Sequence, residues 1–401
     1  MSCLYNCKPD LTPNSTRKEK EGTPIFMIRF ETGDVVFPPV NLYADFVESC
    51  KKYKVIGEEG KLTRYTVSEN LEYVLQKRTE ERDIDRPDDS FQLGQVLFDK
   101  GSYSQALVHF KNAILRYDDP RAKYQIGVML FDDLLDYEDI KQYENPQRAA
   151  FYIMQGLLSL DRGVGSPLGN AELVDAAAFN LYLAYLQGWG IEQSDELALR
   201  YLQTAATYGD TKVSVMAQTT MGYFYSSADH MDLLKAFYWH SEACQNGSVE
   251  SQAVLGVLHM FGLGSASKDW GTALKCLRDA SEKGSVYATG MLAFLYFRRA
   301  LYTLASRTAY SLVGNMELRN SIMIDTRDGG GGSGRSVFDI QTRCFIQRGL
   351  TVACFIYATC LDRGLGIQQD RGIASTMYSR CVNIDPTTTS RLQNMVIREE
   401  I

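Results

Sequence analysis

Four histidines are the first residues to test for catalytic or metal-binding chemistry, because imidazole is both a general base and a common metal ligand. They are His109, His230, His240 and His259. We expect none of them to form a metal-binding pair with a second histidine or cysteine three or four residues away, the spacing that puts two ligands on one side of a helix. We therefore predict no metal site, and we expect His240 and His259 to have structural roles within helices.

Three Gly-x-Gly pairs are the next candidates, because glycine-rich loops can hold phosphate groups. They begin at Gly188, Gly262 and Gly364. A dinucleotide fingerprint follows a strand, whereas each of these pairs follows a predicted helix. The chain also lacks a Gly-x-Ser-x-Gly nucleophile elbow. We predict that the protein is not an enzyme and has no cofactor. The enzyme alternative is a hydrolase with an unfamiliar site, whose turnover would depend on His240 or His259.

Charge and composition limit the classes of partner. The chain has 42 Lys and Arg against 49 Asp and Glu, a net charge of −7. Without a basic stripe, the attraction to phosphates on which nucleic-acid binding depends is missing. No apolar run reaches the roughly 18 residues of a membrane span, so we predict no direct membrane insertion. Nine cysteines without paired spacing, and an amino terminus without a signal peptide's apolar segment, predict reduced thiols and a cytoplasmic location.

Small residues recur at fixed offsets, which is typical of a helical repeat. Trp239, Ala243 and Gly247 lie 3, 7 and 11 residues after Ala236. The same offsets connect Ala198 with Gly209 and Ala273 with Gly284. Residues at these offsets share one face of a helix, where alanine allows close approach of another helix and the final glycine ends the helix. We call helices with this pattern second helices.

A partner pattern precedes each turn and marks the first helix of a unit. Leu255-Gly256 is followed by the Gly-x-Gly turn at Gly262, and Tyr357-Ala358 by the one at Gly364. The small residue in this dipeptide recurs along the chain, with Gly222, Gly256 and Ala293 separated by steps of 34 and 37 residues. A period in the thirties predicts pairs of helices stacked in an array.

These motifs resemble Sel-one-like repeats, which are relatives of the tetratricopeptide repeat with a longer turn. More narrowly, KAFYWHSEACQNGSVESQAVLG and the tail GLGIQQD…IDPTTTSRLQNMVIREEI resemble the megalin-binding protein family. The resemblance covers roughly residues 90–401. It implies a scaffold or adaptor that binds the cytoplasmic tail of the endocytic receptor megalin.

The patterns together predict an all-α fold, a right-handed α-α superhelical solenoid over residues 88–401. A small N-terminal α+β appendage is expected over residues 23–87, opening with a hairpin that turns at Gly33-Asp34. Residues 1–22 are polar and are expected to be disordered. The Gly-rich insert at about 326–336 is expected to be a mobile loop or an added linker.

The predicted site is the inner side of the first helices, where a solenoid offers an extended surface to a peptide. With Leu-Gly counted as positions 7 and 8, positions 2, 5, 9, 12 and 13 should face inward. We predict a non-enzymatic adaptor that binds a peptide segment of a protein partner there. The alternative for each of these residues is that it packs against a neighbouring helix. The alternative for the whole protein is that it is a structural subunit of a ciliary or ubiquitin-ligase complex. The selected residues are Tyr223, Glu250, Val257, Met260, Phe261, Phe294, Phe297 and Arg298.

Overall fold

The computed structural model divides the chain into two compact units, each described here by itself. The first comprises residues 1–129 and 134–142, and the second comprises residues 130–133 and 143–401. The division falls within the stretch that the sequence predicts as one array. The structure describes residues 28–29, 35–36, 76–77, 87–162, 169–227, 230–264, 267–314 and 337–398.

The first unit contains a short strand pair and a helical repeat. The strands are antiparallel, with Ile28 opposite Val36 and Arg29 opposite Val35, where the sequence predicts a hairpin. The rest of the predicted appendage lies almost entirely outside the described residues. The elements are β1 (Ile28–Arg29), β2 (Val35–Val36), α3 (Pro87–Asp99), α4 (Tyr103–Tyr117), α6 (Tyr137–Ile140), and α5 (Pro120–Phe131), whose last two residues belong to the second unit.

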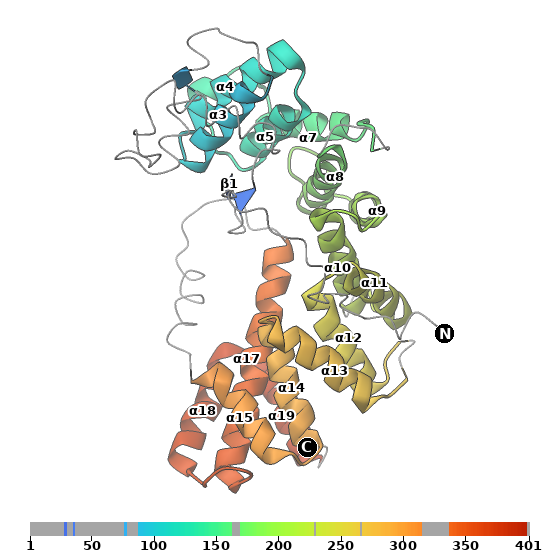
Figure 1. The fold of residues 1–401 in the computed structure, drawn as a ribbon, viewed down its shortest axis with the longest axis vertical. Coiled ribbons are helices and arrows are strands. Elements are labelled where there is room, and N and C mark those ends of the chain that lie inside the picture. Colours follow the sequence, from blue (N-terminus) through green and yellow to red (C-terminus); the bar gives the residue numbers. More distant parts are fainter. Residues whose placement is uncertain are drawn as a thin grey trace, which may run out of the picture. The chain divides into compact units, whose positions relative to one another are not determined.

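The second unit is built only from helices over its described residues, and consecutive helices pack as pairs (Figure 1). The pairs are α8 with α9, α10 with α11, α12 with α13, α14 with α15, and α17 with α18. This arrangement confirms the predicted helical-repeat fold. The helices are α7 (Pro146–Leu157), α8 (Asn170–Gln187), α9 (Asp195–Ala206), α10 (Lys212–Ser226), α11 (Leu233–Gln245), α12 (Val249–Phe261), α13 (Trp270–Glu282), α14 (Val286–Arg298), α15 (Tyr302–Val313), α17 (Val337–Arg363), α18 (Arg371–Ile384) and α19 (Pro386–Ile397).

Side-chain caps fix where many of these helices begin. The Thr211 hydroxyl accepts a hydrogen bond from the Ser214 backbone N–H at 3.0 Å at the start of α10. Ser248 caps α12 in the same way, through the backbone N–H of Ser251 at 3.1 Å. Such caps satisfy backbone N–H groups that the first turn of a helix leaves without a partner. The polar turn residues of the repeat therefore set the starts of the helices.

The small residues hold the two helices of each repeat together, as the sequence predicts. Ala243 of α11 and Ala280 of α13 are completely buried. On the first helices, a Cβ atom at Gly222 would lie 2.6 Å from the His240 ring, and one at Gly256 would lie 2.7 Å from Leu277 Cγ. Real Cβ atoms do not approach that closely, so glycine at these two positions allows the helices of the pair to touch.

Helix α17 differs from the prediction in its length. The sequence places the start of the last unit at Val352, but the helix begins at Val337 and runs for 27 residues. The segment Cys344–Arg363 is long and apolar enough to cross a membrane. However, 72% of an apolar 18-residue stretch within this segment is buried inside the protein. Because it is packed between other helices, we interpret this segment as a core helix. The Gly-rich insert lies outside the described residues.

Candidate partner-binding surface

One side of helices α10, α12 and α14 contains most of the predicted site residues. On α12, Glu250, Val254, Val257 and Phe261 follow one another at spacings of 4, 3 and 4 residues, which places them on one side of the helix. Residues 37 positions later occupy the equivalent side of α14. We call this surface the first-helix face. Its accessible or half-buried members are Glu250, Val257 and Phe261 of α12 and Tyr287 and Arg298 of α14. Its buried members are Tyr223 of α10, Val254 of α12, and Met291 and Phe294 of α14.

Position 12 of the repeat does not belong to this surface. Met260 and Phe297, the residues at that position in α12 and α14, are only 0% and 6% exposed and lie in the hydrophobic core. The reason is local geometry, since position 12 comes four residues after the small residue at position 8 and so points toward the second helix. Phe294 is also buried in this core. Packing against a neighbouring helix, the alternative weighed from sequence, therefore holds for these three residues.

Position 13 of α12 carries the most exposed of the predicted site residues. Phe261 is 39% exposed although it is a large aromatic residue, and its ring centroid lies 6.3 Å from that of Phe294. Arg298, at the same position of the next repeat, is half-buried, and so are Val257 and Glu250. An aromatic ring with apolar and charged neighbours is a combination often found at protein interfaces.

Tyr223 is buried because another part of the chain covers it. The ring of Phe345, from α17, stacks on Tyr223 with a centroid distance of 4.5 Å and an interplanar angle of 22°. Tyr287 of α14 approaches the same Phe345 ring edge-on at 4.8 Å. Sequence reasoning missed both partners. Tyr287 occupies position 2, the position that selects Glu250 in α12, so the repeat pattern contains the signal for it. Phe345 precedes its repeat and carries no such signal.

The phenols of this cluster are neutral at physiological pH. Burial raises the pKa of Tyr223, and the nearby Glu250 and Tyr287 raise it further. Burial also raises the pKa of Tyr287, although the charge of Arg348 and a hydrogen bond with it act in the opposite direction. The Arg348 guanidinium lies 5.3 Å from the centroid of Phe345. This part of the face therefore offers aromatic rings and hydroxyl groups to a ligand.

The two helix histidines have the structural roles expected of them. His240 is fully buried under Gly222, with Nδ1 3.0 Å from the Ser251 hydroxyl oxygen. Burial lowers its pKa to about 3, although a backbone hydrogen bond at Gly222 opposes the shift. His259 is buried with its ring edge-on to Phe237. Cys244 does follow His240 by four residues, but the described part of the chain brings no third metal-binding side chain to them.

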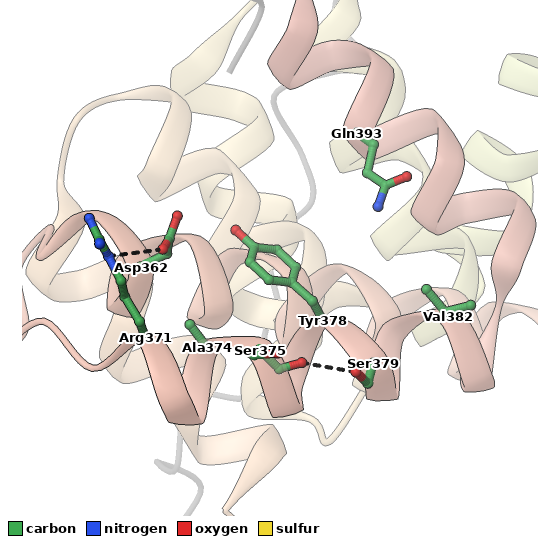
Figure 2. A pocket seen from close by; sticks show the side chains of 8 residues that line it. All are labelled: Asp362, Arg371, Ala374, Ser375, Tyr378, Ser379, Val382 and Gln393. Atoms are coloured by element: carbon green, nitrogen blue, oxygen red, sulfur yellow. Dashed lines mark hydrogen bonds and ion pairs between the residues drawn. The ribbon is translucent and has the colours of Figure 1, made fainter.

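A separate hollow of about 330 Å³ lies between α17, α18 and α19 (Figure 2). Three of its polar side chains have these partners: Arg371 Nε lies 3.9 Å from Asp362 Oδ1, the Tyr378 hydroxyl is 3.1 Å from that of Thr359, and the Ser379 hydroxyl donates to the Ser375 carbonyl oxygen. None of the predicted site residues lines it. The lining residues are Asp362, Arg371, Ala374, Ser375, Tyr378, Ser379, Val382 and Gln393.

The repeat pattern matches a known family. The Sel1 repeat model matches residues 176–210, 215–248, 249–285 and 351–374. These four segments are similar to the Sel1 repeat. Proteins built from Sel1 repeats generally act as protein-interaction scaffolds and bind protein partners. The first three matches cover α8 to α13, and the fourth begins within α17, so the first part of that helix lies outside the matched repeat.

Solved structures similar to this chain include three proteins with related repeats. A Sel1 repeat protein from Oxalobacter formigenes is 20% identical, with a TM-score of 0.44 and coverage of 74% of this chain and 100% of that one. The protective antigen c5321 of uropathogenic Escherichia coli, which displays an SLR fold, is 16% identical, with a TM-score of 0.34 and coverage of 90% of each chain. A putative sel1 repeat protein from Klebsiella pneumoniae subsp. pneumoniae is 17% identical, with a TM-score of 0.31 and coverage of 56% of this chain and 98% of that one.

Proposed function

We propose that this chain is a non-enzymatic cytoplasmic adaptor that binds a peptide segment of a protein partner on the first-helix face. Its Sel1 repeats support the general role of an interaction scaffold. The observation that carries the choice of surface is the exposure of Phe261, which stands beside half-buried Val257 on α12, with half-buried Arg298 at the same position of the next repeat. An aromatic anchor, with an arginine at the same position of the next repeat, suits a partly apolar peptide, because such residues dominate the binding energy of many interfaces.

The cytoplasmic tail of megalin is the partner we propose to test first. Its support is the resemblance of residues 235–256 and of the carboxy-terminal tail to the megalin-binding protein family. Residues 235–256 form α11 and the first part of α12, so the resembling stretch supplies Glu250 and Val254 of the first-helix face. A tail peptide is also of the chemical class that a row of first helices can bind along its length.

The test combines Phe261→Ala with Arg298→Ala in the full chain and measures its affinity for a synthetic megalin tail peptide. We expect affinity to fall by about tenfold or more, since each side chain contributes on the order of 1 kcal/mol at an interface. The circular dichroism spectrum should remain that of the parent, because neither side chain belongs to the buried core.

A matched control removes one aromatic residue and one arginine from the second helices. Tyr238→Ala with Arg278→Ala takes away an exposed tyrosine of α11 and an exposed arginine of α13. This control should bind as the parent does. If both double variants bind equally well, the first-helix face is not the binding surface. If the parent does not bind the megalin peptide at all, the proposed partner is wrong.

A further inference from the structure

The first part of α17 lies outside the residues that match the Sel1 repeat, and it packs on helices of other repeats. The other described helices of the second unit have 12 to 18 residues, whereas α17 has 27, and the matched repeat begins only at residue 351. We call residues 337–350 the α17 extension. Figure 1 shows it continuing past α14 toward α10, and it contacts both helices.

Two glycines allow this crossing. A Cβ atom at Gly290 of α14 would collide with the backbone carbonyl of Gly349, and a Cβ atom at Gly349 would lie 2.6 Å from the backbone of Tyr287. The two helices therefore touch backbone to backbone at this point, as glycine permits. The crossing directs the α17 extension across the first-helix face, and Phe345 lies one turn before Gly349.

Phe345 packs against residues of α10, α12 and α14. Tyr223 stacks on its ring, Tyr287 meets the ring edge-on, and Val254 belongs to the same apolar cluster. We call Tyr223, Val254 and Tyr287 the aromatic seat. Offset-stacked and edge-on contacts are the favourable arrangements for aromatic rings, so the seat is shaped to accept one aromatic side chain.

Arg348 follows Phe345 by three residues and lies on the same side of the helix. Its guanidinium lies 5.3 Å from the centroid of the Phe345 ring and forms a hydrogen bond with Tyr287. The fit is incomplete, however, because Arg348 Nε is buried and has no hydrogen-bond partner among the described residues. A buried donor without an acceptor weakens the docked arrangement. A ligand whose arginine has all its donors paired, or leaves them exposed to water, would compete well with Phe345 and Arg348 for this position.

We propose that the aromatic seat is a binding site for a partner helix that carries an aromatic residue followed three residues later by arginine, and that the α17 extension occupies it when no partner is bound. This inference rests on the proposed function and specifies the ligand and its internal competitor. The chain's own Phe345 and Arg348 supply the pattern of the ligand. A partner must displace an occupant that is covalently attached and present at high effective concentration. Its apparent affinity falls by the fraction of time that the seat is empty.

The experiment supplies the α17 extension as a separate molecule. A fluorescent peptide of residues 337–350, with serine in place of Cys344 to prevent oxidation, is titrated with the full chain while anisotropy is recorded. The chain is tested as the parent and as the double variant Phe345→Ala with Arg348→Ala. We expect the peptide to bind the double variant about tenfold or more tightly than the parent, because the substitutions weaken the internal competitor.

Two controls identify the seat as the site. Cys344→Ala removes an exposed neighbour on the same helix and should leave peptide binding at the level of the parent. A peptide in which alanine replaces Phe345 should not bind the double variant. Hydrogen exchange provides a second measurement, with faster exchange expected at residues 337–350 of the double variant and unchanged exchange in α11 and α12. Peptide binding that is equal for parent and double variant, or absent from both, overturns the proposal.

The oligomeric state and the partner experiment separate the remaining outcomes. A dimer of the parent that dissociates in the double variant would assign the seat to the α17 extension of a second copy and overturn occupation within one chain. If a partner binds through Phe261 and Arg298 while the 337–350 peptide binds no variant, the proposed function stands and this inference fails. If the peptide binds as expected but substitutions at Phe261 and Arg298 do not affect partner binding, this inference stands and the proposed function fails.

Discussion

The α12–α13 repeat and the α17–α18 repeat start from the same sequence pattern but use their glycines differently. In α12, Gly256 lies against Leu277 of the second helix of its own repeat. In α17, Gly349 lies against the backbone of α14, a first helix of the preceding repeat. A small residue therefore marks a point of close approach without identifying the helix that approaches. Gly256 stands at position 8 of the repeat, and that position identifies Leu277 of the second helix as its partner. Gly349 precedes its repeat, so no repeat position identifies its partner.

The two regions also differ in the range of their contacts along the chain. His240 packs under Gly222 and Leu277 packs against Gly256, so the two helices of a regular repeat contact each other directly, and further contacts go to adjacent repeats. Phe345 instead contacts Tyr223 and Tyr287, which belong to two earlier repeats. Damage to a regular repeat should therefore destabilise the fold directly. Damage at the α17 extension should first release a helix segment from a surface.

The largest effect should come from overpacking a regular repeat, with Ala243→Trp. Ala243 is completely buried where α11 meets its neighbours. Inserting an indole there should lower the free energy of unfolding by about 3 kcal/mol or more, measured by chemical denaturation. Replacing exposed Tyr238 of the same helix by tryptophan is the control and should change little. An unchanged midpoint for Ala243→Trp would mean that the repeat phase is wrong.

A smaller loss is expected at the helix crossing, from Gly349→Ala. The added Cβ atom would meet the backbone of Tyr287 at 2.6 Å, and backbone cannot move aside as a flexible side chain can. We expect a loss of about 2 kcal/mol, within the usual range for overpacking. Gly156→Ala is the matched control, because a Cβ atom there meets nothing within 4 Å. If both substitutions raise stability as ordinary helix glycine replacements do, α17 and α14 do not touch backbone to backbone.

The third effect depends on pH and belongs to the regular repeat alone. Burial lowers the pKa of His240 from 6.5 to about 3, so the folded chain keeps this imidazole neutral while the unfolded chain protonates it. Stability should therefore be constant above pH 6.5 and decrease as pH falls toward 3, because protons bind preferentially to the unfolded state. Between pH 7 and pH 5 this group should account for a loss of about 2 kcal/mol.

The His240→Leu variant provides the measurement. Its Ser251 neighbour keeps a hydrogen-bond partner in the Thr219 hydroxyl at 3.3 Å, so the substitution leaves that group satisfied. Denaturation curves at pH 7 and pH 5 should differ less for this variant than for the parent. His230→Ala, which changes an exposed histidine, should keep the dependence of the parent. If stability falls by the same amount between pH 7 and pH 5 in all three chains, groups other than His240 cause the loss.

The regular repeats could be predicted from sequence because their determinants are local and periodic. Ala236, Ala243 and Ala280 recur at fixed offsets, and all three are buried at helix contacts. The candidate site could be predicted only in part. The count placed Met260 and Phe297 on the surface, although position 12 lies on the same side of the helix as the buried small residue at position 8.

The α17 extension could not be predicted from the pattern. Its contacts join residues far apart in the chain, and no residue type at a fixed spacing announces that Phe345 will meet Tyr223. The repeat pattern could have predicted Tyr287, because Tyr287 and Glu250 both stand at position 2 of their repeats. The predicted disordered terminus and the Gly-rich insert lie outside the described residues and stay predictions.

The contact between Phe345 and two repeats also fixes the number of repeats between them. In an ordinary array each repeat touches only its neighbours, so the array can be lengthened or shortened by whole units. Tyr223 and Tyr287 flank α12, and one phenylalanine ring bridges them. Inserting or deleting one unit between α10 and α14 would move the two tyrosines out of reach of the same ring. This segment of the array therefore behaves as a block of set length, within a fold that otherwise tolerates duplication.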